Sequence, residues 1–144
     1  MDIEQTVVYV INNDSAIQRL IKGRFRPIAA AQWDVRPYVG YYPTVPDEQF
    51  DHYGGDATTR RIEFTFEITG DTFQQVKQIS AAFRSALHSR ASLTHSLNGL
   101  TIEDIQFAWG KHNGDSDLSE PPDVGNANPI KRISSQYLIL YREV

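Results

Sequence analysis

A change of hydrophobic period between residues 60 and 87 constrains the fold of this chain more than any other feature. In the first half of this segment the apolar residues occupy every second position, which is typical of a strand with one buried face: Ile62, Phe64, Phe66 and Ile68. After a turn at Gly70 they recur at steps of three and four, which is typical of a helix with one buried stripe: Phe73, Val76, Ile79, Phe83 and Leu87. The segment therefore predicts a strand followed by a helix that covers its apolar face.

The sequence also indicates where this helix begins and ends. Thr72 with Gln75, or Asp71 with Gln74, can cap the first free N–H groups and receive a reciprocal bond, while Gly70 permits the turn. Basic or titratable side chains near residues 84–90 suit the exposed carbonyl groups of a helix C-terminus. We expect a helix over residues 72–88.

The remaining segments predict an α+β domain. Residues 2–12 have apolar side chains at helical spacing, although their β-branched residues would also suit a strand; we predict a helix. A second short helix follows a cap at Asn13 or Asp14 and is closed by Gly23. Strands are predicted at residues 38–42, 101–109 and 130–144. We expect an antiparallel or mixed β-sheet of about four strands, with the helices packed on one face.

The length of 144 residues suits one domain, which we take as residues 1–144. Two segments rich in Pro, Gly, Asp and Asn predict long loops at about residues 43–60 and 110–128, and the Asn-Gly pair at residues 98–99 predicts a tight turn. The final segment has Ile133, Tyr137, Ile139 and Tyr141 on one face with Leu138 and Leu140 on the other. A strand that is apolar on both faces is either central or covered by a partner.

The composition excludes several classes of function. The chain contains no cysteine, so disulfides and thiolate catalysis are excluded. The net charge of −4 lacks the basic footprint of a nucleic-acid reader. No secretion signal and no apolar run of the length of a membrane span is found, so we expect a soluble product made in the cytoplasm, without a membrane partner.

Candidate chemistry is sparse. His88 and His95 are seven residues apart, but no HExxH pattern occurs and a metal site is the weaker interpretation. The acidic residues between positions 113 and 123 lack the glycine and the glutamate of a helix-loop-helix calcium site, so a solvated loop is favoured. No nucleophile elbow or glycine-rich phosphate cradle is found. We expect no enzymatic activity, no catalytic residue, no metal and no cofactor.

Basic clusters and aromatic residues offer a better lead. Residues 22–26 and the pair Arg60-Arg61 either close a helix and pair with nearby acids, which we favour, or contact a partner chain or a phosphate backbone. Aromatic residues crowd into residues 25–42 beyond the needs of a core, as at protein interfaces. We expect a subunit or partner interface to include these residues: Lys22, Arg24, Arg26, Tyr41, Tyr42, Arg60, Asp115 and Asp117.

The order of these features resembles the tail-completion (tail-terminator) proteins of long-tailed bacteriophages. The resemblance rests on the capped helix and glycine-basic turn of residues 13–25, on Pro27-Ile28, on the proline-aromatic strand entry at residues 36–39, and on the strand and helix of residues 61–87. It covers about residues 3–143. The motifs that carry it are structural.

This resemblance implies a subunit of a homohexameric ring at the head-proximal end of the tail tube. Such a ring ends tail polymerisation, joins tail to head, and has the tail tube protein and a head-side connector or neck protein as partners. Genomic DNA can pass through its lumen without sequence-specific binding. The implied location is the virion, at the head–tail junction, after assembly in the host cytoplasm.

A ring closes by heterologous contacts, and the basic turn at residues 22–26 and the acidic residues 115–123 are candidate complementary patches. Two alternatives remain open. One is another neck or head-completion protein of the same junction. The other, of a different class, is a small ligand-binding or enzymatic α+β domain that uses a pocket between the central helix and the sheet.

Overall fold

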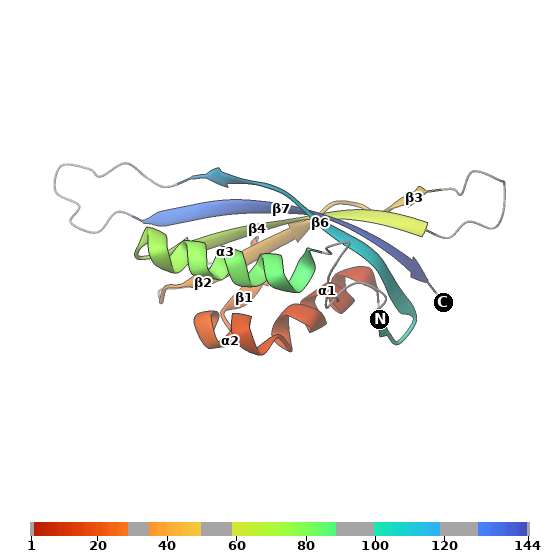
Figure 1. Ribbon diagram of the computed structural model, residues 1–144, viewed down its shortest axis with the longest axis horizontal. Helices are drawn as coiled ribbons and strands as arrows, with labels where there is room; N and C mark the ends of the chain where they lie inside the picture. The colour runs from red at the N-terminus through yellow and green to blue at the C-terminus, as the bar shows by residue number, and fades with distance from the viewer. Residues whose placement is uncertain (1, 29–34, 50–58, 89–99, 119–129, 144) are drawn as a thin grey trace.

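The computed structural model describes residues 2–28, 35–49, 59–88, 100–118 and 130–143. Within these ranges the chain forms three helices and seven strands (Figure 1). In chain order they are α1 (Ile3–Asn12), α2 (Ser15–Ile21), β1 (Phe25–Pro27), β2 (Tyr38–Pro43), β3 (Asp47–Gln49), β4 (Thr59–Gly70), α3 (Phe73–Leu87), β5 (Thr101–Ile102), β6 (Ile105–Asp117) and β7 (Lys131–Glu143).

All seven strands belong to one mixed sheet. Six of them follow the order β1-β2-β4-β7-β6-β5, and β3 pairs with the first residues of β4. Only β1 and β2 run parallel to each other; the other pairs are antiparallel. The α+β class is confirmed, but the prediction of about four strands is wrong. The four long strands were found, whereas β1, β3 and β5 have only two or three residues and carry no readable period.

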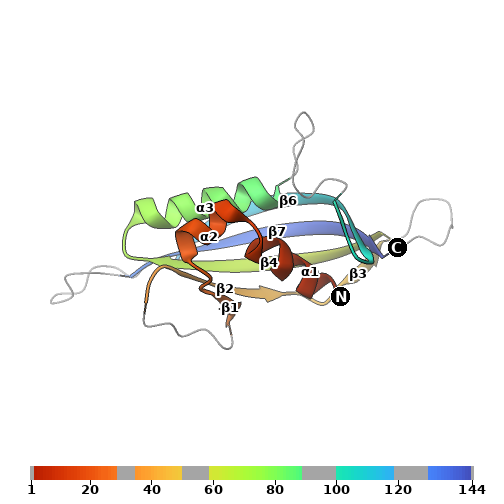
Figure 2. The same ribbon diagram turned by 90° about the horizontal axis from the view of Figure 1, so that it is seen from below.

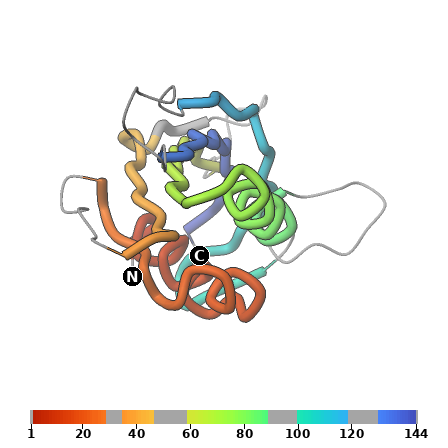
Figure 3. Tube along the Cα trace, turned by 90° about the vertical axis from the view of Figure 1, so that its left-hand side faces the viewer, coloured from red at the N-terminus to blue at the C-terminus, as the bar shows by residue number. Residues whose placement is uncertain are grey.

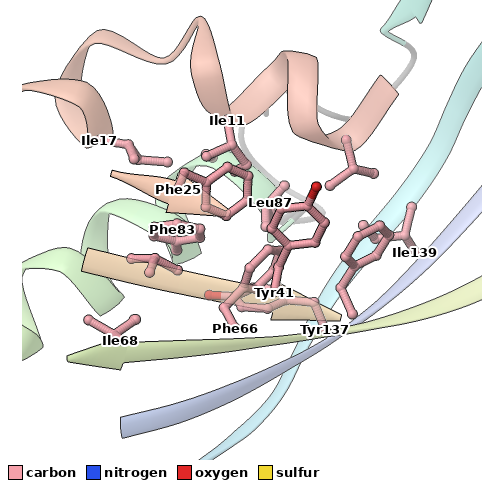
Figure 4. Packing of buried hydrophobic residues seen from close by; sticks show 14 of the residues in the cluster. Ile11, Ile17, Phe25, Tyr41, Phe66, Ile68, Phe83, Leu87, Tyr137 and Ile139 are labelled. Atoms are coloured by element: carbon pink, nitrogen blue, oxygen red, sulfur yellow. The ribbon is translucent and has the colours of Figure 1, made fainter. Parts of the chain in front are cut away.

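The helices lie together on one face of the sheet, as predicted (Figures 1 and 2). Seen end-on, the sheet curves partly around α3 (Figure 3). The core between them is one cluster in which Phe66 of β4 packs on Phe83 of α3 at 4.9 Å between ring centroids. Phe25 and Tyr41 extend the cluster toward α1 and α2 (Figure 4).

The buried rows of β4 and β7 are those that the alternation predicted. Every second residue of each strand is buried against the helices: Ile62, Phe64, Phe66 and Ile68, and Ile133, Tyr137, Ile139 and Tyr141. Strand β7 lies between β4 and β6 and is therefore central, one of the two predicted alternatives. Its second face, with Leu138 and Leu140, is only partly buried.

Helix α3 begins as predicted, but one residue of its predicted buried stripe is exposed. The Gln75 N–H donates to the Thr72 hydroxyl at 3.1 Å, and the Asp71 N–H donates to Gln75 Oε1 at 2.9 Å. Four of the five predicted stripe residues are fully buried, but Phe73 is 39% exposed. It lies in the first turn, beyond the cover of the core, and Lys131 Nζ lies 4.7 Å from its ring centroid.

The N-terminal segment is the predicted pair of helices. Asp2 and Gln5 form a capping box at the start of α1, and Asp14 accepts the Ile17 N–H at the start of α2. The end of α2 differs in detail, because Lys22 itself adopts the left-handed conformation with φ 53°, and Gly23 follows it at φ 76°.

Strand β6 corrects two predictions. It continues to Asp117, so the predicted loop at residues 110–128 is wrong for residues 110–117. Register shifts between Phe107 and Trp109 and between His112 and Gly114 interrupt its alternation. The first shift moves Trp109 off the buried face, where Ile105 and Phe107 lie, and pairs it with Leu140. A single inserted residue cannot be detected by counting the spacing of apolar residues in the sequence.

The predicted loop at residues 43–60 contains β3 and the start of β4. Its residues 50–58, most of the predicted turn at residues 97–100, and residues 119–128 of the second loop lie outside the described residues. No helix in the described part of the chain is long and apolar enough to cross a membrane.

The turn between β4 and α3 gives a test of this packing. A Cβ added at Gly70 would lie 2.9 Å from Val76 Cγ2 and 2.8 Å from Gln75 Oε1. Because Val76 is fully buried, it cannot yield easily. We expect Gly70→Ala to lower the free energy of unfolding by about 1–3 kcal/mol, measured by urea denaturation. The double variant Gly70→Ala, Gln75→Ala should recover only part of the lost unfolding free energy, because the contact with Val76 remains. Full recovery would mean that the steric clash at position 70 involves Gln75 alone.

Candidate functional site

The face of the sheet opposite the helices carries a mixed surface. At its centre Leu138 of β7 lies between Glu63 of β4 and Lys111 of β6, and in the next row Leu140 lies between Arg61 and Trp109. Leu138, Leu140 and Trp109 are partly exposed. An apolar centre with charged neighbours is typical of a protein contact surface. We call these six residues the open-face patch.

The two predicted interface tyrosines face opposite ways. Tyr42 is on the open face opposite Thr65 and is 47% exposed. Tyr41 faces the helices and packs on Phe25, with ring centroids 4.6 Å apart and only 7% of its surface exposed. Tyr41 is therefore a core residue, which leaves little of it for a neighbouring subunit.

The predicted basic residues lie in two places. Lys22 is exposed after α2, and Arg26 is exposed on β1. The Arg24 Nε donates to the Pro37 carbonyl at 2.6 Å and so ties β1 to the chain before β2. Arg60 lies near the C-terminal end of β7 and forms an ion pair with Glu143 at 3.1 Å. Arg24 and Arg60 thus already have partners within the chain.

Asp115 of β6 is the centre of a polar network near the edge of the sheet opposite β1. Its carboxylate accepts hydrogen bonds from the Ser135 hydroxyl and from His112 Nε2, the latter at 2.8 Å, and lies 3.7 Å from Arg84 Nη2 of α3. Burial raises the pKa of this carboxyl, but the bonds from Ser135 and His112 and the charge of Arg84 outweigh burial and lower the pKa below its ordinary value.

The same network joins β6 to the end of α3. The His112 N–H donates to His88 Nδ1 at 3.0 Å, so this nitrogen of His88 acts as a hydrogen-bond acceptor. In the part of the chain that is described, no group of three His, Cys, Asp or Glu residues could hold a metal ion. His95, the second residue of the weaker metal interpretation, lies outside the described ranges.

A cavity of about 630 Å³ lies beside Asp115, between α3 and the ends of β6 and β7. Asp115 and Asp117 face Lys77 and Arg84 across it. The residues that line the cavity are these: Phe73, Lys77, Ser80, Ala81, Arg84, Ser85, Asp115, Asp117 and Ile133. This is the pocket between helix and sheet that a ligand-binding domain would need.

The eight predicted interface residues thus do not form one site. The structure brings Asp115 and Asp117 together on β6, and it places Lys22, Arg24 and Arg26 around β1, with β2, β4 and β7 in between. Sequence reasoning missed Arg84, His112 and Ser135. One signal was available, since Ser135 is a hydroxyl residue in the buried row between Ile133 and Tyr137.

Comparison with known proteins identifies similar solved structures. No known family and no curated protein matches the sequence. Among solved structures, the fold is similar to a chain in the structure titled "Virion of native gene transfer agent (GTA) particle", with a TM-score of 0.64 and 14% sequence identity. The match covers 94% of this chain and 91% of that chain. At this identity the likeness shows a shared fold.

The Asp115 network predicts a dependence of stability on pH. The pKa of Asp115 is lower in the folded protein than in the unfolded chain. The contribution of Asp115 to the free energy of unfolding is therefore complete at pH values above the ordinary carboxyl pKa of about 3.9. It is lost as the pH falls through the lower pKa of the folded protein. We expect Asp115→Asn to cost about 1 kcal/mol near neutral pH and progressively less in acid. Urea denaturation over a pH series tests this, with Asp117→Asn as control. A loss of unfolding free energy in Asp115→Asn that stays the same at all pH values would contradict this prediction.

Tyr137 offers a second test. Its hydroxyl is buried and, among the described residues, has no hydrogen-bond partner. Replacing an unsatisfied polar group by an apolar one of the same shape is neutral or stabilising. We expect Tyr137→Phe to leave the free energy of unfolding unchanged or to raise it by up to about 1 kcal/mol. Tyr141→Phe, which removes a hydroxyl bonded to Arg60, should instead destabilise the protein. A loss in Tyr137→Phe equal to that in Tyr141→Phe would reveal a partner.

Proposed function

We propose that this chain is a structural protein of a phage-like particle, and specifically a tail-terminator subunit that forms a homohexameric ring. The observation that carries the proposal is the likeness to a chain of a gene transfer agent virion over 94% of this chain and 91% of the other. Because nearly the whole of both chains corresponds, the likeness involves the entire domain and not a common substructure. In this proposal the protein acts by assembly and performs no catalysis.

The open-face patch supports an assembly role. A partly exposed tryptophan and two leucines lie on a sheet face that no described helix or strand covers (Figure 1). Aromatic residues at the centre of a mixed surface are common at interfaces. In the proposed particle the partners are other copies, the tail tube protein and a head-side neck protein at the head–tail junction, with genomic DNA passing through the lumen.

Two other functions deserve a test. Another neck or head-completion protein would share the same surfaces. A ligand-binding domain is favoured by the cavity beside Asp115, which is of the size that small molecules occupy. Against this second alternative, two charged groups of the cavity, Arg84 and Asp115, already lie 3.7 Å apart as an ion pair. These two groups are therefore less available to a ligand.

Antibody-gold labelling of particles, viewed by negative-stain electron microscopy, tests the proposal. Label at the junction of head and tail is the expected result. It should be accompanied by shorter tubes when the purified chain is added to polymerising tail tube protein, since a terminator ends growth. Label only elsewhere on the particle would overturn the role at the head–tail junction. The absence of the protein band from the particle would overturn the whole proposal and favour the ligand-binding alternative.

A pair of variants tests the open-face patch in the same assay. Leu138→Asp places a charge at its centre, beside Glu63, and should reduce incorporation into particles at least about tenfold. Phe73→Asp changes an exposed apolar residue on the helix side and should be incorporated normally. Equal incorporation of both variants, with unchanged circular dichroism, would mean that the open-face patch is not a contact.

A further inference from the structure

We propose that neighbouring copies of this chain join edge to edge, so that the open edge of β6 near Asp115 in one copy takes strand β1 of the next and the sheet continues across the interface. This inference names the contact within the proposed ring and rests on that proposal. The occupant of the edge is therefore a second copy of this chain.

The second edge of β6 is open near Asp115. Strand β6 pairs with β7 along its length, but on its other side it pairs with β5 only at Ile105 and Gln106. The Leu118 N–H donates to the Arg132 carbonyl of β7. Because backbone groups alternate in direction along a strand, those of Ser116 and Gly114 also face β7, whereas those of Asp115 face away. No described strand lies on that side of Asp115.

The outer edge of β1 offers acceptors without donors. The Val39 N–H of β2 donates to the Arg24 carbonyl, so the groups of Arg24 and Arg26 face β2 and those of Phe25 and Pro27 face outward. The Phe25 N–H is already bonded to the Gly23 carbonyl at 2.9 Å, and proline has no N–H. Two copies of β1 therefore cannot pair with each other, because neither supplies a donor. An edge with a free N–H, such as that of Asp115, is complementary.

Charge disfavours self-pairing of β6 and does not oppose the mixed pair. Residues 114–118 contain two carboxylates and no cation, whereas residues 22–27 contain three cations and no acid. Pairing β6 with a second β6 would bring four carboxylates together, and like charges on adjacent strands are destabilising. Both symmetric pairings are thus unfavourable, and the remaining pairing is head-to-tail, as ring closure requires.

The strand directions and rows of the sheet fit this contact. From the pairings, β1 and β6 run in opposite directions within one copy, so a continued sheet joins them antiparallel. One row across the sheet contains Arg26, Gly40, Glu67, Ser134 and Ser116. If the row continues without stagger, Arg26 of one copy lies opposite Ser116 of the next. The Asp115 N–H then meets the Pro27 carbonyl, and the helix sides of both copies coincide.

Engineered disulfides test the contact, because the natural chain has no cysteine. In the proposed register Arg26 and Ser116 form a pair without mutual hydrogen bonds, with Cα atoms about 4.5 Å apart, which suits a disulfide. Within one copy they are separated by four strand spacings, about 19 Å along the sheet, which is too far for one. The double variant Arg26→Cys, Ser116→Cys, oxidised with diamide, should therefore give a ladder of covalent oligomers on a denaturing gel.

Two controls make the result specific. Arg26→Cys with Lys111→Cys keeps a cysteine on the same face of β6 but in a different row, and it should give several-fold less linked product. A mixture of the two single variants, Arg26→Cys and Ser116→Cys, should stop at heterodimers. No species above the dimer in the first double variant, or equal linking in the Lys111 control, would overturn the edge contact. Gold label at the head–tail junction would then still support the proposed function, so the two failures are distinguishable.

Discussion

The pairing of β4 with β7 is the constraint on which the rest of the structure depends. Its register runs without a shift from Thr59 opposite Arg142 to Gly70 opposite Lys131. Two rows of mostly apolar side chains, from Ile62 to Ile68 and from Ile133 to Tyr141, therefore point to one side of the sheet, with Ser135 as the polar residue among them. Helix α3 can cover both rows because the chain turns at Gly70 directly from the end of β4, and α1 and α2 complete the cover beside it.

Within the described residues, the helices cover one face of the sheet and leave the opposite face uncovered (Figure 1). The open-face patch is partly apolar, and the two ends of the strand order differ in character. At one end β1 presents outward-facing carbonyl groups but no donor, because Pro27 has no N–H and the Phe25 N–H is bonded to the Gly23 carbonyl. At the other end β6 contains no proline, and no described strand pairs with it near Asp115. The two edges are therefore complementary and not alike, as the head-to-tail contact of the proposed ring requires.

Much of the fold could be predicted from the sequence, and the failures have physical causes. The periods of residues 62–68, 73–87 and 131–143 are long and each reflects burial on one face, so β4, α3 and β7 were predicted nearly to their ends. The register shifts of β6 at Trp109 and Gly114 break the period in the middle of a strand. The Gly-Asp-Asn composition that follows then indicated a loop where a ladder continues. Local composition cannot show that β7 lies alongside to supply the hydrogen bonds.

The site was harder to predict because it depends on contacts between residues distant in sequence. The charges of residues 22–26 and of Asp115 and Asp117 were predicted to belong to an interface, and only the sheet order shows that they lie at opposite edges. The buried or exposed state of adjacent tyrosines likewise depends on β2 pairing with β4, which turns Tyr41 inward and Tyr42 outward.

The Asp115 network connects the edge of β6 to α3 and β7. An edge strand has only one side of its backbone bonded within the sheet. Here β6 has two further connections: His88, which follows α3, accepts the His112 N–H, and Arg84 of α3 and Ser135 of β7 bind the Asp115 carboxylate. Because these bonds hold the segment around Asp115 against α3 and β7, the proposed addition of a neighbouring strand would order fewer groups than on a loose edge and would lose less conformational entropy. In that proposal the polar network supports an assembly edge and does not serve as a ligand site.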